Sequence, residues 1–134
     1  MIVVVDASAA VEVILDRPRA EELRSYLEEA DYVIAPDLYV SEVANALWKY
    51  LSSMPEGSID VSIVEDAVEL PDDLVASRSL YREAFSLSVR ESHPVYDCLY
   101  LIVARRNSAT LLTLDTRLAT LAKAENVPVR PDLL

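Results

Sequence analysis

Short apolar runs alternate with helical patterns along nearly the whole chain, and this alternation limits the fold more than any other feature of the sequence. Residues 2–5 (IVVV) form a β-branched run that is typical of a buried strand. Further runs are found at residues 32–34, near Leu74, at 109–114 and at 127–129. Strands separated by helices favour a parallel sheet covered on both faces. We therefore expect an α/β protein, a three-layer α/β/α sandwich around a short, mostly parallel central sheet.

Helical patterns fill the segments between these runs. They cover residues 10–14, 19–30, 37–51, 59–70, 79–91, 95–106 and 116–125. The segment VYDCLYLIVARR at 95–106 is apolar nearly all round, which predicts a central, buried helix. Segment 37–51 has a single apolar stripe. Trp48 and Leu51 can belong to an interface with another protein, but we expect both to pack in the core. Pro128 lies in the last short run and favours an edge position for that strand.

The size and composition of the chain suit one domain over residues 1–134. The chain has 134 residues, 52% of them hydrophobic, which is enough to build one core. No apolar run reaches the length of a membrane-spanning helix, and the start MIVVVDAS lacks the basic region of a secretory signal. Cys98 is the only cysteine and has no partner for a disulfide, so we expect a packing role in a reducing cytoplasm.

The net charge of the chain is −11, from 23 acidic and 12 basic residues. Such a balance is unfavourable for binding nucleic acid, because phosphate contacts come from lysine and arginine. Two arrangements remove the conflict. Bound cations can neutralise some of the carboxylates, or the few basic residues can gather in one place. The sequence leaves both arrangements open.

Two aspartates follow apolar runs directly, and each precedes a helical pattern. Asp6 ends the run IVVVD, and Asp115 ends LLTLD. Each residue fits an ordinary N-cap of the following helix. Each also fits a ligand site, since ligands of parallel sheets bind beyond the carboxyl ends of the strands. Thr113, two residues before Asp115, can present its hydroxyl on the same side of the strand.

Two further acids lie in helical patterns. Asp97 is the only charged residue between Pro94 and Ala104, and a carboxylate in such apolar surroundings usually has a partner or a metal. The alternative is a favourable charge in the first helical turn. Glu42 fits a solvated helical glutamate, or a member of the same site with Asn45 on the same face to orient it.

Together, the four acids predict one constellation at the carboxyl edge of the sheet. Like charges this close raise one another's pKa values unless a cation neutralises them. Oxygen-only ligands favour magnesium or manganese, and the single histidine and single cysteine exclude an ordinary zinc site. We assign no chemistry to His93, which precedes Pro94 at a helix start. Arg117 fits either a phosphate contact or a solvated arginine on the helix surface.

Four segments resemble the PIN-domain family, and in particular the VapC-type toxins of toxin–antitoxin pairs. They are IVVVDAS at the start, SEVANAL at 41–47, VYDCLYLIVA at 95–104 and LLTLDTRL at 111–118. The resemblance implies that Asp6, Glu42, Asp97 and Asp115 are the catalytic, metal-binding acids. It also implies that Ser8, Asn45 and Thr113 are supporting polar groups.

The function implied by this resemblance is an endoribonuclease that uses Mg or Mn to cut RNA phosphodiester bonds. In this hypothesis the acids hold one or two ions against the scissile phosphate, with Asp6 and Asp97 as the most direct ligands. The family also implies an RNA substrate, a cognate antitoxin protein and a homodimer. We expect the antitoxin to be basic at least in part, so that an arginine can enter the acidic crevice.

Two other functions stay open. The first is a non-catalytic PIN-like domain that acts only by binding another protein, which the excess of acids allows. The second is an aspartate-based phosphotransferase or hydrolase with Asp6 as nucleophile. That class requires a second aspartate where Ser8 stands, or a lysine after a late strand, where Thr113 and Asp115 are found.

Overall fold

The computed structural model describes residues 1–55, 57 and 60–133 and contains a five-stranded sheet of order β3-β2-β1-β4-β5. The strands are β1 (Ile2–Val5), β2 (Tyr32–Pro36), β3 (Asp73–Val75), β4 (Thr110–Leu112) and β5 (Val129–Arg130). All neighbouring strands are parallel, with Val4 paired to Ile34 of β2 and to Leu111 of β4. The parallel α/β class expected from the alternating pattern is confirmed.

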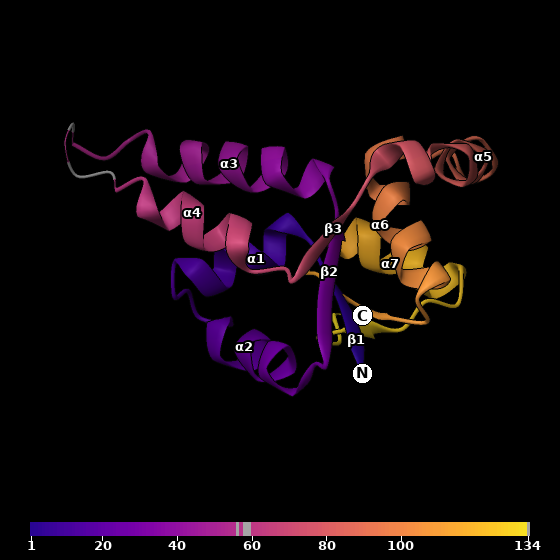
Figure 1. Ribbon diagram of the computed structural model, residues 1–134, viewed down its shortest axis with the longest axis horizontal. Coiled ribbons are helices and arrows are strands. Elements are labelled where there is room, and N and C mark those ends of the chain that lie inside the picture. Colours follow the sequence, from indigo (N-terminus) through magenta and orange to yellow (C-terminus); the bar gives the residue numbers. More distant parts are fainter. Residues whose placement is uncertain (56, 58–59, 134) are drawn as a thin grey trace.

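Helices cover both faces of this sheet (Figure 1). They are α1 (Ala7–Ile14), α2 (Ala20–Glu29), α3 (Leu38–Leu51), α4 (Ser62–Glu69), η1 (Ser77–Ser79), α5 (Tyr81–Glu91), α6 (Val95–Arg106) and α7 (Thr116–Ala124). Helices α1 to α4 lie on one side of the sheet and α5 to α7 on the other, which gives the three layers. The expected helix 59–70 begins at Ser62 in the structure, and residue 59 lies outside the described residues.

The core confirms the central helix. Seven consecutive residues of α6, Cys98 to Ala104, are buried, and this helix contacts β1, β2 and β4. Burial raises the pKa of the Cys98 thiol to about 11, so the thiol stays protonated and packs as an apolar group. No helix among the described residues is long and apolar enough to cross a membrane.

The expected core packing is found for Leu51 but not for Trp48. Leu51 is buried, together with Leu47 one turn earlier on the same stripe of α3. The expectation for Trp48 is wrong, because its side chain is 64% exposed. Trp48 follows Leu47 directly, and adjacent helical positions point about 100° apart, so the stripe that buries Leu47 turns Trp48 away from the core.

The strand order creates a switch point between β1 and β4. From β1 the chain passes through α1 and α2 to β2, whereas from β4 it passes through α7 to β5 on the opposite side of the sheet. The two connections therefore diverge at the carboxyl ends of neighbouring strands and leave a crevice there. Asp6 follows β1 and Asp115 lies beyond β4, so the fold places both aspartates beside this crevice.

Candidate functional site

Asp6 is the most enclosed of the four predicted acids. Its side chain caps α1, where Oδ1 accepts hydrogen bonds from the Ala9 amide at 3.0 Å and from the Ser8 hydroxyl at 2.7 Å. The other oxygen, Oδ2, accepts from the Thr113 hydroxyl. The residue is only 5% exposed. The N-cap interpretation is thus confirmed, and it leaves the carboxylate at the carboxyl end of β1.

The surroundings of Asp6 disfavour its charge. Burial raises the pKa of this carboxyl from 3.8 to about 6, although the hydrogen bonds from Thr113, Ala9 and Ser8 oppose the rise. The neighbouring carboxylate of Asp115 raises it further. Burial disfavours the ionised form of this carboxyl, and a cation bound beside it would stabilise that form.

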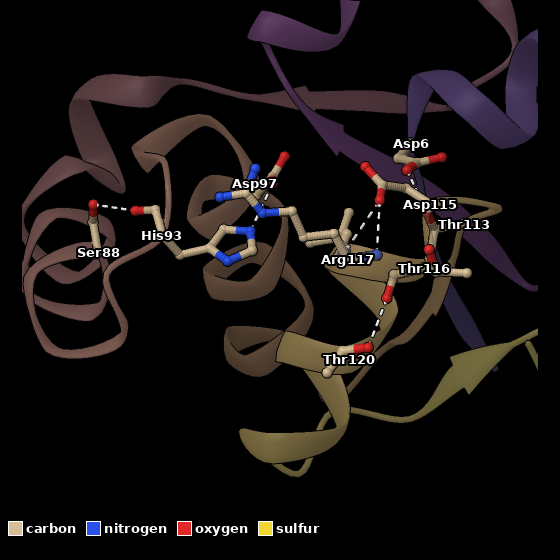
Figure 2. Close-up of polar contacts among 10 residues, drawn as sticks. Asp6, Ser88, His93, Asp97, Thr113, Asp115, Thr116, Arg117 and Thr120 are labelled. Carbon is tan, nitrogen blue, oxygen red and sulfur yellow. Dashed lines mark hydrogen bonds and ion pairs between the residues drawn. The ribbon is translucent and has the colours of Figure 1, made fainter. Parts of the chain in front are cut away.

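Ser8 and Thr113 join the ends of β1 and β4. The Ser8 hydroxyl donates to Asp6 and accepts from the Leu114 amide at 2.9 Å. The Thr113 hydroxyl likewise donates to Asp6 and accepts from the Asp115 amide at 3.0 Å. The two hydroxyls therefore connect Asp6 to the backbone that carries Asp115. Figure 2 shows Thr113 beside Asp6 and Asp115.

Asp115 caps α7 from the neighbouring strand end. Its Oδ1 accepts from the amides of Arg117 at 2.9 Å and Leu118 at 3.3 Å. The residue is exposed, and its Oδ2 accepts no hydrogen bond from the described residues. Asp115 therefore combines a capping oxygen with one that faces outward.

We expect Asp115→Ala to lower the free energy of unfolding by about 1 kcal/mol, because two amides at the start of α7 lose their acceptor. Asp115→Asn keeps an oxygen at the cap, and we expect it to change the unfolding free energy by less than about 0.5 kcal/mol. Urea denaturation measures both variants. Equal losses in the two variants would contradict the capping role.

Glu42 approaches from α3, and Tyr100 orients it. The Tyr100 hydroxyl donates to Glu42 Oε1 at 2.5 Å from the buried face of α6. Partial burial raises the pKa of Glu42, the Tyr100 hydrogen bond opposes this, and the charges of Asp97 and Asp115 raise it further. Asn45, expected to orient Glu42, is exposed and makes no side-chain hydrogen bond with the described residues.

Asp97 lies in the first turn of α6 and is held by a partner that the sequence analysis did not assign. Its Oδ2 lies 2.7 Å from Nε2 of His93, which is four residues earlier and precedes the cap residue Pro94. The backbone of His93 is fixed in turn by Ser88, whose hydroxyl donates to the His93 carbonyl oxygen. Figure 2 shows the Arg117 side chain extending from the start of α7 toward Asp97.

The four acids influence one another electrostatically, but as pairs. Asp115 acts on Asp6, while both Asp97 and Asp115 act on Glu42. In the part of the chain that the structure describes, no three His, Cys, Asp or Glu side chains are close enough to hold a metal ion. The acids are therefore close enough to act on one another in pairs, but no three of them form a closed metal cage among the described residues.

This arrangement fits a hydrated divalent cation of the magnesium type. Magnesium keeps several water ligands and is usually held by one or two carboxylates together with substrate phosphates. Glu42, Asp97 and Asp115 each have one carboxylate oxygen that accepts no hydrogen bond from the described residues. The donor set consists of hard oxygens, and Asp6 adds a second carboxylate next to Asp115.

A cavity of about 510 Å³ adjoins this site on the side of α1 and α3. Ser8 and Leu114 line its end toward the acids. Arg17 and Lys49 bring two positive charges to its wall, and Arg17 packs over the ring of Tyr50, 5.5 Å from the ring centre. Arg17 is also paired with Glu12, at 3.5 Å.

Fold and site together define an α/β protein with an oxygen-rich acidic centre at the switch point of a parallel sheet. The PIN domain family matches residues 3–124, and the chain belongs to this family. Ribonuclease VapC3 of Pyrobaculum aerophilum is 32% identical over 125 residues, which cover 89% of this chain and 93% of that protein.

Two solved structures share the fold. PAE2754 from Pyrobaculum aerophilum has a TM-score of 0.70 and 20% identity, over 89% of this chain and 83% of the other. VapC20 of Mycobacterium tuberculosis, described as a toxin that cleaves the sarcin-ricin loop, has a TM-score of 0.66 and 15% identity, over 88% and 93%. At these identities the two structures support the PIN-like fold.

Proposed function

We propose that this protein is a metal-dependent endoribonuclease that cuts RNA phosphodiester bonds. The observation that carries the proposal is the gathering of Asp6, Glu42, Asp97 and Asp115, from four separate elements, around the carboxyl ends of β1 and β4. Membership of the PIN-domain family and the likeness to Ribonuclease VapC3 support the same activity.

In this proposal the four acids hold the cation and the attacking water, and two hydroxyls hold one of these acids. Asp6 and Asp97 are the most direct ligands of the cation, and Asp115 binds it through its outward oxygen, directly or through water. Glu42 orients the attacking water or holds a second cation. Ser8 and Thr113 keep the Asp6 carboxylate in place through the hydrogen bonds described above. When bound, magnesium or manganese activates a water molecule as nucleophile and neutralises charge on the phosphate.

Arg117 gives the site a positive charge toward the substrate. It is exposed, it forms no ion pair with the described residues, and its side chain extends toward Asp97 (Figure 2). Most other arginines are paired with acids; Arg90 and Arg105, for example, both bind Glu125. Arg117 is therefore placed to contact a phosphate next to the one that is cut.

We expect Arg117→Gln to weaken RNA binding by about tenfold and to reduce the slope of log K against log salt by about one, because one phosphate contact is lost. The rate at saturating RNA should change less. Arg24→Gln, which removes the same charge from α2, where Arg24 is paired with Asp16, is the control. A salt dependence equal in both variants would contradict the phosphate contact.

We extend the proposal to a toxin with a cognate antitoxin, because VapC20, which shares the fold, is described as a toxin and the chain is also similar to Ribonuclease VapC3. The antitoxin is a small protein that is basic at least in part, and one of its arginines pairs with the acidic site. The protein itself forms a homodimer in the cytoplasm. Tyr81, Phe85 and Val89 form an exposed apolar row on α5, and such rows are typical of interfaces.

RNA cleavage with and without a chelator tests the function. The protein is incubated with a mixed RNA in excess Mn²⁺ or Mg²⁺, and in parallel with the same cation and a larger amount of chelator. We expect cleavage that depends on the cation. Intact RNA under all conditions, from protein that is folded by circular dichroism, would favour the non-catalytic interaction domain.

A further inference from the structure

Three of the four acids share one pattern of contacts: one carboxylate oxygen is anchored and the other is left outward. Backbone amides anchor Asp115. Side chains anchor the other two, since Tyr100 binds Glu42 and His93 binds Asp97. Neither Tyr100 nor His93 has a part in the function proposed above. Each of them nevertheless holds one acid of the site by a hydrogen bond.

His93 is held more firmly than a surface histidine. Its side chain is only 9% exposed. Its amide donates to the Ser88 carbonyl oxygen at 3.2 Å, and its own carbonyl oxygen accepts from the Ser88 hydroxyl. Because a carboxylate only accepts hydrogen bonds, Nε2 carries the proton in the contact with Asp97. The imidazole is thus a fixed donor aimed at one oxygen of Asp97.

Tyr100 plays the matching part for Glu42. It lies three residues after Asp97 and therefore on the same side of α6. The residue is 2% exposed, and burial together with the Glu42 charge raises the pKa of its hydroxyl, so the hydroxyl remains a donor. The contact joins positions 58 residues apart in the sequence and connects α6 to α3 across the site.

We propose that His93 and Tyr100 are positioning residues of the acidic site, which fix the rotamers of Asp97 and Glu42 so that their outward oxygens face the same divalent cation. The inference rests on the proposed function. An anchored carboxylate loses less rotational freedom when it takes up an ion, and outer partners of metal ligands typically change metal affinity by about tenfold to a hundredfold.

Manganese binding without RNA tests Tyr100. Free Mn²⁺ is titrated against the full chain and followed by electron paramagnetic resonance. We expect Tyr100→Phe to weaken Mn²⁺ binding by about tenfold or more. Tyr39→Phe is the matched control, because Tyr39 is equally buried but donates to the backbone oxygen of Ala67. Both variants should lower the melting temperature, and only Tyr100→Phe should change the affinity.

Conservative rescue tests His93. His93→Phe keeps a planar ring but has no donor, and we expect it to weaken Mn²⁺ binding by about tenfold or more. His93→Gln places an amide near the position of Nε2, and we expect it to restore most of the affinity. A purely structural role would instead make the two variants differ in melting temperature and leave the affinity of both at the parent value.

The outcomes separate this inference from the function on which it rests. If the parent protein binds Mn²⁺ and cuts RNA while Tyr100→Phe and His93→Phe bind Mn²⁺ as tightly as the parent, the positioning roles are wrong and the nuclease proposal stands. If the parent binds no Mn²⁺ and cuts no RNA, both proposals fail. Weaker binding in both variants, with His93→Gln rescued and Tyr39→Phe unchanged, supports the inference.

Discussion

Asp6→Asn should reduce RNA cleavage by more than about a hundredfold, because it removes a carboxylate from the metal site that the proposal requires. The fold should be retained. The amide oxygen of asparagine can replace Oδ1 as acceptor for the Ala9 amide and the Ser8 hydroxyl. Thr113, which now donates to Oδ2, can accept from the new amide group instead. The measurement is the initial rate of RNA cleavage at saturating Mn²⁺.

The control for this variant is Asp31→Asn. Asp31 precedes β2, is exposed and contacts the N-terminal amine, so it lies at the amino ends of the strands, opposite the acidic site. We expect cleavage at the parent rate. If purified Asp6→Asn cuts RNA as fast as the parent, with the same products, then Asp6 is not a metal ligand and the mechanism proposed above is wrong.

The fold was accessible from the sequence because its strands are buried on both faces. Such strands appear as continuous apolar runs, and the run at residues 2–5 coincides with β1. The edge strands were harder to define. β3 contributes two exposed residues among its three, so only Leu74 pointed to it, and β5 begins after Pro128. Edge strands have one hydrogen-bonded neighbour and carry less apolar signal.

Asp6 and Asp115 could be singled out because their local setting is visible in the sequence. Each follows a strand and begins a helix, and each turns out to be an N-cap that also faces the switch point. The cap and the site were treated as alternatives, yet they are compatible. A carboxylate has two oxygens, and the hydrogen bonds of Asp115 to the start of α7 occupy one of them.

The partners of Asp97 and Glu42 could not be derived from sequence patterns. His93 is four residues before Asp97, but it meets the carboxylate only because the turn after α5, with Ser92 in the left-handed region, ends at Pro94, the cap of α6. Tyr100 reaches Glu42 through the packing of α6 against the remainder of the core. A histidine four residues before an acidic residue in an apolar segment was the one available signal.

The pairing of charges bears on the phosphate contact that we propose for an acidic chain. Arg90, Arg105 and Arg106 are engaged with glutamates on the surface of α5 to α7, which removes them from contact with a ligand. Arg117 has no such partner among the described residues. For the proposed phosphate contact, the position of Arg117 matters more than the net charge of −11, because a single unpaired cation beside the acids acts at short range.

In metal-free buffer, we expect the parent to lose stability relative to Asp6→Asn as the pH rises from 4 to about 6. Burial raises the pKa of Asp6 in the folded protein from 3.8 to about 6, so the folded state binds the proton more tightly than the unfolded chain does. Stability is therefore highest below the unfolded pKa and falls as the carboxyl ionises. The rise of the pKa from 3.8 to about 6 corresponds to a loss of about 3 kcal/mol in the free energy of unfolding.

The measurement is urea denaturation of both proteins between pH 3.5 and 8, in steps of about half a pH unit across the titration. Subtracting one profile from the other removes the remaining acids, including Asp31 and Glu125, whose lowered pKa values act in the opposite direction. The difference should be small at pH 3.5, grow to about 3 kcal/mol as the pH passes 6 and level off above pH 7. Saturating Mn²⁺ at pH 7.5 should stabilise the parent more than Asp6→Asn, since a ligand stabilises only the state that binds it. A flat difference profile would mean that the Asp6 carboxylate is well solvated. The unfavourable ionisation that a bound cation would relieve would then be absent.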